Sequence, residues 1–312
     1  MNSVPMRDGY GQALLSLCEN RDDIMVLDAD VAKSTRTVWI RDKYPDKFMD
    51  MGIAEQDMVG TAAGLALSGM VPFVSTYCVF LAGRAWDQIR TTVCYNDLNV
   101  KFGGAHAGIS VGPDGATHQA LEDVALTRVL PNMTVVVPCD AEETRKATLA
   151  AAAMQGPCFI RFGREAVPVI TDETTPFELG RARLVRKGTD VTVFANGALV
   201  YESLLAAETL AGEGISVQVY DLHTVKPLDE AAILAAAKET GCIVTAEEHQ
   251  LAGGMGSAVA EYLVQSCPVP MEMVGVQDSF GESGQPAELM AKYGLDSSAV
   301  AEKIRRVLAR KA

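Results

Sequence analysis

The feature that most constrains the fold of this 312-residue chain is a long run without charged side chains, residues 58–83. Such a run is long enough to cross a bilayer as one helix. Four glycines and Pro72 interrupt it, however, and residues 68–73 (SGMVPF) combine a helix stop with a strand start. We therefore predict a small-residue helix over 54–68 and a buried strand over 71–77, and no membrane span.

The net charge of the chain argues against some classes of binding partner. The chain carries 27 Lys and Arg against 40 Asp and Glu, a net charge of −13. Nucleic acids and anionic membrane surfaces bind basic patches, so neither is expected as a partner. The seven cysteines form no CxxC pair, and the N-terminus lacks a signal-peptide pattern. Reduced thiols and a cytoplasmic location are therefore predicted.

Short apolar runs alternate with helical patterns along the whole chain, which predicts α/β architecture with parallel sheets covered by helices on both faces. We expect two doubly wound domains, the second one smaller, over 1–168 and 190–312. The intervening segment, 169–189, is rich in Pro, Thr and charge and is predicted to be a linker. The expected strands cover 23–30, 47–52, 71–77, 99–105, 133–139, 157–162, 191–195, 215–222, 242–248 and 268–276.

Polar side chains fall at the predicted carboxyl ends of the first-domain strands, where open parallel sheets bind ligands. An acid, an aromatic ring, a histidine and an arginine at one edge suit a polar pocket. The plainer alternative is that loop residues are polar in any protein. The residues concerned are Asp30, Glu55, Tyr77, His106 and Arg161.

The loop over 103–123 is the most informative segment, because it is rich in glycine and carries His106 and His118. Long glycine-rich loops inside compact domains are usually functional. Asp114 and His118 are candidates for binding hydroxyls or phosphate, or for moving protons near neutral pH. His106, Asp114 and His118 have no recognisable metal-ligand spacing, so no metal site is predicted. The alternative is a turn followed by a helix N-cap at Thr117.

Four motifs carry a family resemblance. MGIAEQDMVGTAAGLA (51–66) resembles the glutamate motif of transketolases, and GPDGATHQALED (112–123) resembles their substrate loop. DLHTVKPLD (221–229) and EEHQLAGGMGSAVAEYL (247–263) are similar to the C-terminal domain of several thiamine diphosphate enzymes. The chain thus resembles the C-terminal half of a transketolase split between two polypeptides, a pyrimidine-binding domain followed by a transketolase C-terminal domain.

The resemblance implies roles at the cofactor. Glu55 is the carboxyl that hydrogen-bonds N1′ of the aminopyrimidine and thereby favours the imino tautomer that activates the thiazolium. A carboxyl in a dry pocket has a physical reason to share a proton with a ring nitrogen. Tyr77 and Phe80 match aromatic positions that pack on the pyrimidine, and Asp30 matches a cofactor-proximal position. The family's third position, near residues 83–84, has no clear match.

The resemblance also implies roles at the substrate. His106, Asp114 and His118 match contacts to sugar hydroxyls and phosphate, and His118 joins Glu55 as a catalytic residue. Arg7, Ser34 and Arg161 match the phosphate end, where guanidinium groups bind oxygens bidentately.

The family's diphosphate motif, GDG followed by an asparagine, is missing, since the triplets at 7–9 and 113–115 lack the first glycine. Mg²⁺ (or Ca²⁺) and the diphosphate are therefore expected on a partner, the N-terminal transketolase subunit. The expected assembly is α2β2, with self-association through the β subunits, acting on sugar phosphates. The sugar itself is not identified: pentose phosphates are the default, and a branched or sulfonated ketose stays open.

Three alternatives remain at this point. The β subunit of a 2-oxo acid dehydrogenase shares the glutamate and the C-terminal domain, but has no need of the Asp114–His118 loop. A 1-deoxyxylulose-5-phosphate synthase-like enzyme shares similar motifs in a longer chain. A non-catalytic module with a decayed site is disfavoured by the intact set of candidate residues.

Overall fold

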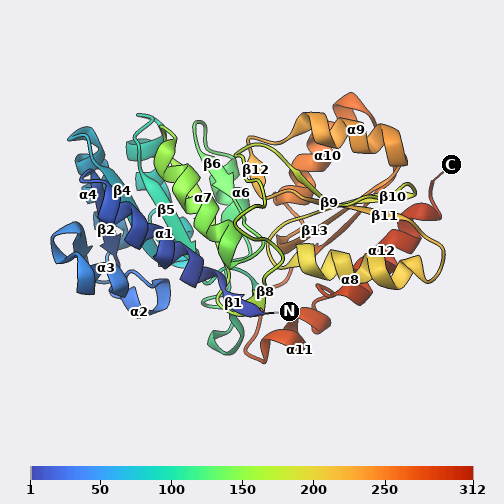
Figure 1. The fold of residues 1–312 in the computed structure, drawn as a ribbon, viewed down its shortest axis with the longest axis horizontal. Coiled ribbons are helices and arrows are strands. Elements are labelled where there is room, and N and C mark those ends of the chain that lie inside the picture. Colours follow the sequence, from blue (N-terminus) through green and yellow to red (C-terminus); the bar gives the residue numbers. More distant parts are fainter. Residues whose placement is uncertain (1, 312) are drawn as a thin grey trace.

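The computed structural model describes residues 2–311 as two α/β domains that lie side by side (Figure 1). The first domain contains a seven-stranded sheet in the order β12-β6-β7-β5-β4-β2-β3, in which every neighbouring pair but β12–β6 is parallel. The parallel α/β prediction is thereby confirmed. The strands are β2 (Ile24–Asp28), β3 (Phe48–Asp50), β4 (Val71–Tyr77), β5 (Lys101–Ala105), β6 (Thr134–Val136), β7 (Cys158–Arg161) and β12 (Thr224–Lys226).

Helices cover both faces of this sheet. Successive side chains of a strand point to opposite faces, and on β4 Phe73 packs with the cluster of α1 and α7, whereas Val74 packs with α4 and α5. The helices are α1 (Met6–Asn20), α2 (Ala32–Thr35), α3 (Val38–Lys43), α4 (Glu55–Leu67), α5 (Cys78–Arg84), α6 (Asp123–Arg128) and α7 (Ala141–Ala153). Short 3-10 turns cover Pro45–Lys47 and Ile109–Asp114, and a π-helical turn covers Gln88–Cys94.

The uncharged run folds as predicted, into α4 and β4. Between them Gly69 has φ +90°, a left-handed turn conformation that glycine adopts without strain. Six of the seven β4 residues are buried, which explains why the strand carries no charge. Among residues 2–311, no helix has the length and hydrophobicity needed to cross a membrane.

The second domain has a five-stranded sheet in the order β14-β13-β10-β11-β9. Its strands are β9 (Arg183–Arg186), β10 (Val191–Ala195), β11 (Val217–Asp221), β13 (Ile243–Gln250) and β14 (Met271–Val276). Its helices are α8 (Leu199–Ala211), α9 (Glu230–Thr240), α10 (Met255–Ser266), α11 (Pro286–Lys292) and α12 (Ser297–Leu308). The segment expected as a linker is partly structured, because β9 lies within it and pairs antiparallel with β11.

The two domains are joined by a strand of the second that extends the sheet of the first and by a buried cluster with residues from both. β12 follows β11 in sequence but adds to the edge of the first sheet, with Thr224 opposite Val136. One buried cluster contains Phe102 and Val135 of the first domain together with Phe194 and Ile233 of the second. A small antiparallel pair, β1 (Ser3–Pro5) with β8 (Ala166–Pro168), ties the N-terminal segment to the same region.

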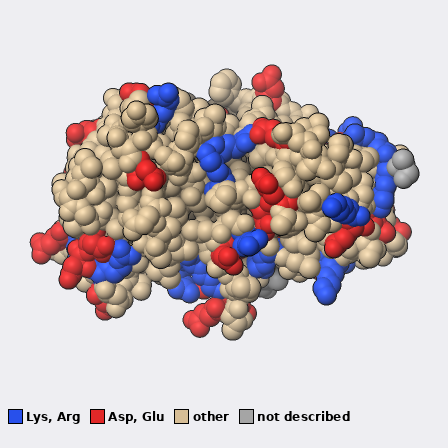
Figure 2. Space-filling view, turned by 90° about the horizontal axis from the view of Figure 1, so that it is seen from above, with Lys and Arg blue, Asp and Glu red and all other residues tan. Residues whose placement is uncertain are grey.

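On the face shown in Figure 2, acidic and basic side chains are interspersed, and much of the first domain, at left, carries neither. This face has no continuous basic surface. All seven cysteines are free thiols, and six of them are buried; Cys267, after α10, is the partly exposed one.

Candidate active site

Four rings gather at the carboxyl edge of the first sheet. Tyr77, the last residue of β4, stacks on His106, which follows β5, with 4.5 Å between ring centroids. Phe80, in the first turn of α5, lies 6.0 Å from Tyr77 and 5.2 Å from His118, both measured between centroids. Parallel strands bring residues that are far apart in sequence to one edge, as expected for a ligand site.

Arg7 and Ser34 complete this group. Arg7, in the first turn of α1, lies with Nη1 3.2 Å from His106 Nε2 and donates to the backbone oxygen of Ser34 at 3.4 Å. The Tyr77 hydroxyl donates to Ser34 Oγ at 3.0 Å. These contacts join four of the residues that sequence analysis selected.

His106 is held as a neutral imidazole. Burial, reinforced by the charges of Arg7 and Arg164, lowers its pKa to about 3. A guanidinium only donates, so Nε2 accepts and the ring proton lies on Nδ1. Nδ1 is buried and has no partner among the described residues. The backbone at His106 has φ +56°, a sparsely populated conformation for a non-glycine residue that often marks functional sites.

Glu55 lies at the first residue of α4 and is only 4% exposed. Arg84 Nη1 lies 3.2 and 3.3 Å from its two carboxylate oxygens. The same guanidinium lies over the Phe80 ring, 3.9 Å from its centroid. Arg84, at the position that the family resemblance left unmatched, therefore contacts both the acid and the aromatic ring assigned to the pyrimidine.

The structure does not bring Arg161 into this group. Its side chain is buried at the end of β7, where Nε donates to Asp123 at 2.7 Å and Nη2 donates to the backbone oxygen of Glu248, also at 2.7 Å. A guanidinium so committed to internal partners is not available to a phosphate.

Arg164, three residues after Arg161, contacts the loop that carries Asp114. It lies beyond the end of β7 and donates to Asp114 at 3.2 Å and to the backbone oxygen of Val111 at 2.9 Å. Burial lowers the pKa of Arg7, and the positive charges of Arg36 and Arg164 add to this effect. The motif RFGR contains both arginines, and the signal that separates them is position: Arg161 ends a buried strand, whereas Arg164 follows it.

The remaining predicted residues lie on loops around the group. Asp30 is exposed in the turn after β2, with φ +61°. The adjacent Asp28 is buried and holds this turn: it accepts from Val31 N at 2.7 Å and from the hydroxyls of Thr35 and Thr37 at 2.8 Å each. Thr117 lies beside His118 and bonds its Nδ1 at 2.9 Å.

The chemistry of these donors fits one half of thiamine diphosphate. A buried carboxylate beside an aromatic ring matches the needs of an aminopyrimidine, which offers a ring nitrogen and a flat face. The unpartnered Nδ1–H of His106 and the guanidiniums of Arg7 and Arg164 suit hydroxyl and phosphate oxygens. The group contains no cluster of carboxylates suited to a hard divalent cation.

A separate group, Cys139, Glu143 and Asp221, has potential metal-ligand atoms that all lie within 4.8 Å of one another. Arg183 already supplies a positive charge there, 2.9 Å from Asp221 and 3.8 Å from Glu143. Burial and the neighbouring Asp221 raise the pKa of Glu143. We therefore interpret the group as a buried ionic contact between the domains.

Comparisons with known proteins agree along the whole chain. Residues 2–169 match the model of the transketolase pyrimidine-binding domain, and residues 180–300 match that of the transketolase C-terminal domain. The chain is 42% identical over 306 residues to the 6-deoxy-6-sulfo-D-fructose transketolase subunit SqwH of Clostridium sp. (strain MSTE9), covering 98% of this chain and 95% of that one. It is 38% identical over 300 residues to a subunit of the apulose-4-phosphate transketolase of Phocaeicola vulgatus, covering 96% of each.

A solved structure described as a split gene transketolase, inactive beta4 tetramer, superimposes with a TM-score of 0.93 at 46% identity, covering 99% of this chain and 100% of that chain. The expected two-domain α/β fold is thus shared over the full length. The chain belongs to the transketolase family of transferases and corresponds to the C-terminal subunit of a split member, a pyrimidine-binding domain followed by a transketolase C-terminal domain.

Proposed function

We propose that this chain supplies the pyrimidine-binding half of a heteromeric transketolase, which transfers a two-carbon ketol unit from a ketose phosphate to an aldose phosphate. The observation that carries the proposal is the set of side chains at one edge of the sheet. The acid Glu55 and the aromatic ring of Phe80 both contact Arg84 at one end of this set. The arginines Arg7 and Arg164 lie at the other end.

Glu55 acts at the cofactor end. The chemistry that thiamine diphosphate supplies when bound is an electron sink beside the carbonyl carbon of the sugar. With the cofactor bound, Glu55 would hydrogen-bond the pyrimidine ring nitrogen, because its carboxyl group is buried and poorly solvated. Phe80 and Tyr77 offer flat apolar surfaces to the ring, and Asp30, in the turn after β2, is assigned to the cofactor's surroundings. Arg84 must leave Glu55 and Phe80 for this arrangement to form.

His106 and His118 act on the sugar. His106 is neutral and donates from Nδ1 to a substrate oxygen, since its Nε2 is turned to Arg7. His118 is the partly exposed imidazole and carries protons to and from sugar hydroxyls. Asp114 binds a hydroxyl and orients Arg164.

Arg7, Ser34 and Arg164 form the phosphate end. Two guanidiniums facing one region repel each other, and a dianionic phosphate relieves that repulsion. Arg164 replaces Arg161 in this role, because Arg161 is bound to Asp123.

A partner chain is proposed to hold the diphosphate and Mg²⁺ (or Ca²⁺), in an α2β2 heterotetramer in the cytoplasm in which copies of this chain also associate. The surface around the helix that presents Glu55 supports a docked partner: Ile53, just before the helix, and Leu67, at its end, are 73% and 74% exposed, and Gly60 and Gly64 face open space. Pentose phosphates are the default substrates. The names of the two relatives extend the candidates to a sulfonated ketose and to apulose 4-phosphate.

Glu55→Ala in the reconstituted complex tests the proposal. Two-carbon transfer should fall by about a thousandfold or more, as for loss of a central catalytic group, while size-exclusion chromatography still shows assembly. Asp57→Ala, an exposed acid in the same helical turn, is the matched control and should keep full activity. Turnover retained by Glu55→Ala would refute the role assigned to Glu55.

A further inference from the structure

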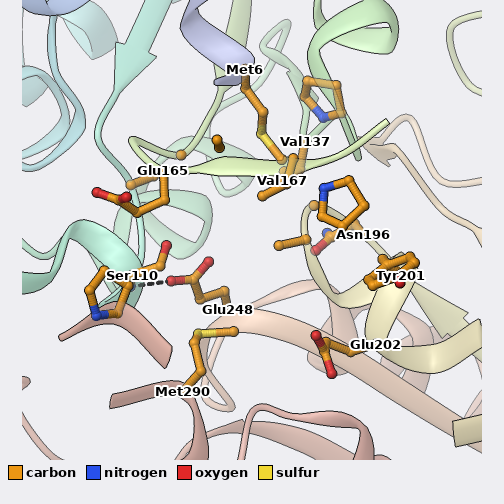
Figure 3. Close-up of a pocket in the computed structure, with 18 of the residues that line it drawn as sticks. Met6, Ser110, Val137, Glu165, Val167, Asn196, Tyr201, Glu202, Glu248 and Met290 are labelled. Carbon is orange, nitrogen blue, oxygen red and sulfur yellow. Dashed lines mark hydrogen bonds between the residues drawn. The ribbon is translucent and has the colours of Figure 1, made fainter. Parts of the chain in front are cut away.

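A pocket of about 420 Å³ lies between the two domains (Figure 3). It opens at the carboxyl ends of β10 and β13. β10 pairs with β11 on one side and β13 on the other, so the chain reverses its winding direction there. In open α/β sheets such a crevice is the usual place for a ligand, and the volume falls in the range of small-molecule sites.

Asn196, the residue after β10, is a buried side chain whose amide group is not used in hydrogen bonding by the described residues. It is 2% exposed and lines the pocket, and its side-chain amide makes no hydrogen bond within residues 2–311. The amide atoms are not among the enclosed unpartnered atoms of the described residues, so they reach the open space of the pocket. The following helix, α8, also begins without a side-chain cap. This end of the pocket therefore has hydrogen-bonding capacity that the described part of the chain does not use.

Two carboxylates face the same pocket. Glu248, near the end of β13, is 6% exposed; one of its oxygens accepts from Ser110 N at 2.5 Å (dashed in Figure 3), and the other makes no hydrogen bond with residues 2–311. Glu202, in the first turn of α8, accepts from Ser297 N at 2.7 Å. Burial raises the pKa of both carboxyls.

The other charges around the pocket are already compensated. Arg161 is bound to Asp123 at 2.7 Å, and Glu165 lies 3.7 Å from Arg164. Within the described residues, no Lys or Arg forms a salt bridge with Glu202 or Glu248; the charge of Arg161 offsets that of Glu248 in part, and the lining as a whole stays acidic. An anionic ligand would add a third negative charge and is disfavoured.

The rest of the lining is apolar. Met6 and Val167 come from the first domain, and Tyr201 and Met290 from the second. Methionine side chains adapt well to aromatic and aliphatic surfaces. The lining thus combines acidic and amide side chains with apolar ones.

We propose that this pocket binds a small primary amine with an apolar body. The ammonium group has three donors, and the acceptors that line the pocket are the carboxylates of Glu202 and Glu248 and the side-chain oxygen of Asn196. The apolar body packs against the methionines and Tyr201. The pocket adjoins the site assigned to the sugar, because Met6, Ala107 and Glu165 are chain neighbours of residues of that site, but of the residues selected from the sequence only Arg161 lines the pocket itself.

Isothermal titration of the purified full-length chain with three probes of similar shape tests the proposal. The probes are 2-phenylethylamine (cationic), 2-phenylethanol (neutral) and 3-phenylpropanoate (anionic), all at pH 7. The amine should bind at one site per chain and about tenfold or more tighter than the alcohol, as for one charged hydrogen bond. The carboxylate should give no binding heat.

Glu248→Gln and Glu202→Gln should each weaken amine binding by about tenfold and leave alcohol binding unchanged. Glu208→Gln, an exposed acid on the same helix as Glu202, is the matched control. Glu202 is half-buried, so its variant keeps the test valid if Glu248→Gln fails to fold. The proposal is overturned if the amine does not bind at millimolar concentration, if all three probes bind equally, or if both glutamine variants bind the amine as the unmodified chain does.

Discussion

At the scale of single residues, Arg84 is the side chain whose position has the sharpest consequence. Its guanidinium is planar and cationic, donates to Glu55 and lies on Phe80, so it makes the two contacts proposed for the cofactor's pyrimidine. Arg84→Ala removes this competitor. We expect cofactor affinity of the assembled complex to rise by about threefold to tenfold, because a half-exposed ion pair and a cation–π contact are each worth up to about 1 kcal/mol. Titration with thiamine diphosphate at saturating Mg²⁺ measures this directly. Arg90→Ala, an exposed arginine on the following π-helical turn, should leave the affinity unchanged, and a loss of affinity in Arg84→Ala would instead assign Arg84 to holding the cofactor.

At the scale of elements, the turn between β2 and α2 depends on one buried carboxyl, Asp28, which accepts hydrogen bonds from Val31, Thr35 and Thr37. Burial raises the pKa of Asp28 to about 6, above the value of about 3.9 for an unfolded chain. The folded state therefore binds this proton more tightly, and the Asp28 contribution to the free energy of unfolding falls as pH rises from about 4 to about 6, then stays constant. Asp28→Asn lacks this titration. We therefore compare the free energies of unfolding of the two proteins by urea unfolding at several pH values. The difference, Asp28→Asn minus the unmodified chain, should increase between about pH 4 and about pH 6 and stay constant above that. A parallel pH profile for the two proteins would contradict the prediction.

At the scale of the whole molecule, the two domains are one structural unit, because β12 of the second closes an edge of the first sheet and the buried cluster crosses between them. A chain truncated after residue 180 would expose the β6 edge and the apolar residues beneath it, which favours aggregation. We expect residues 1–180 to be insoluble when produced alone. Co-production with residues 181–312 should restore a soluble complex, and a soluble, cooperatively unfolding 1–180 fragment would show that the domains are independent.

Long elements with clear periodicity were predictable from the sequence. The predicted strands 71–77 and 191–195 have the same bounds as β4 and β10, because unbroken apolar runs are typical of strands buried on both faces. β9 and β12 were not predicted: they are short, partly polar edge strands whose pairing is set by tertiary contacts.

The site was predictable where a residue type and a strand end coincide, as for Glu55, Tyr77 and His106. Arg161 and Arg164 show the limit. Both belong to the motif RFGR, and their surroundings depend on which residue ends β7 and on the position of Asp123 in a distant helix. The pocket at Asn196 and Glu248 needs both domains, so no local pattern in either segment indicates it.

The burial of the cysteines has a practical consequence. A maleimide reacts with an accessible thiolate. Six of the seven thiols are buried, and burial both shields them and raises their pKa. These six are Cys18, Cys78, Cys94, Cys139, Cys158 and Cys242. Cys267, at the end of α10, is left as a natural attachment point. A fluorophore placed there without any mutation would lie on the second domain and report, by energy transfer or anisotropy, on when and how the subunits of the enzyme come together.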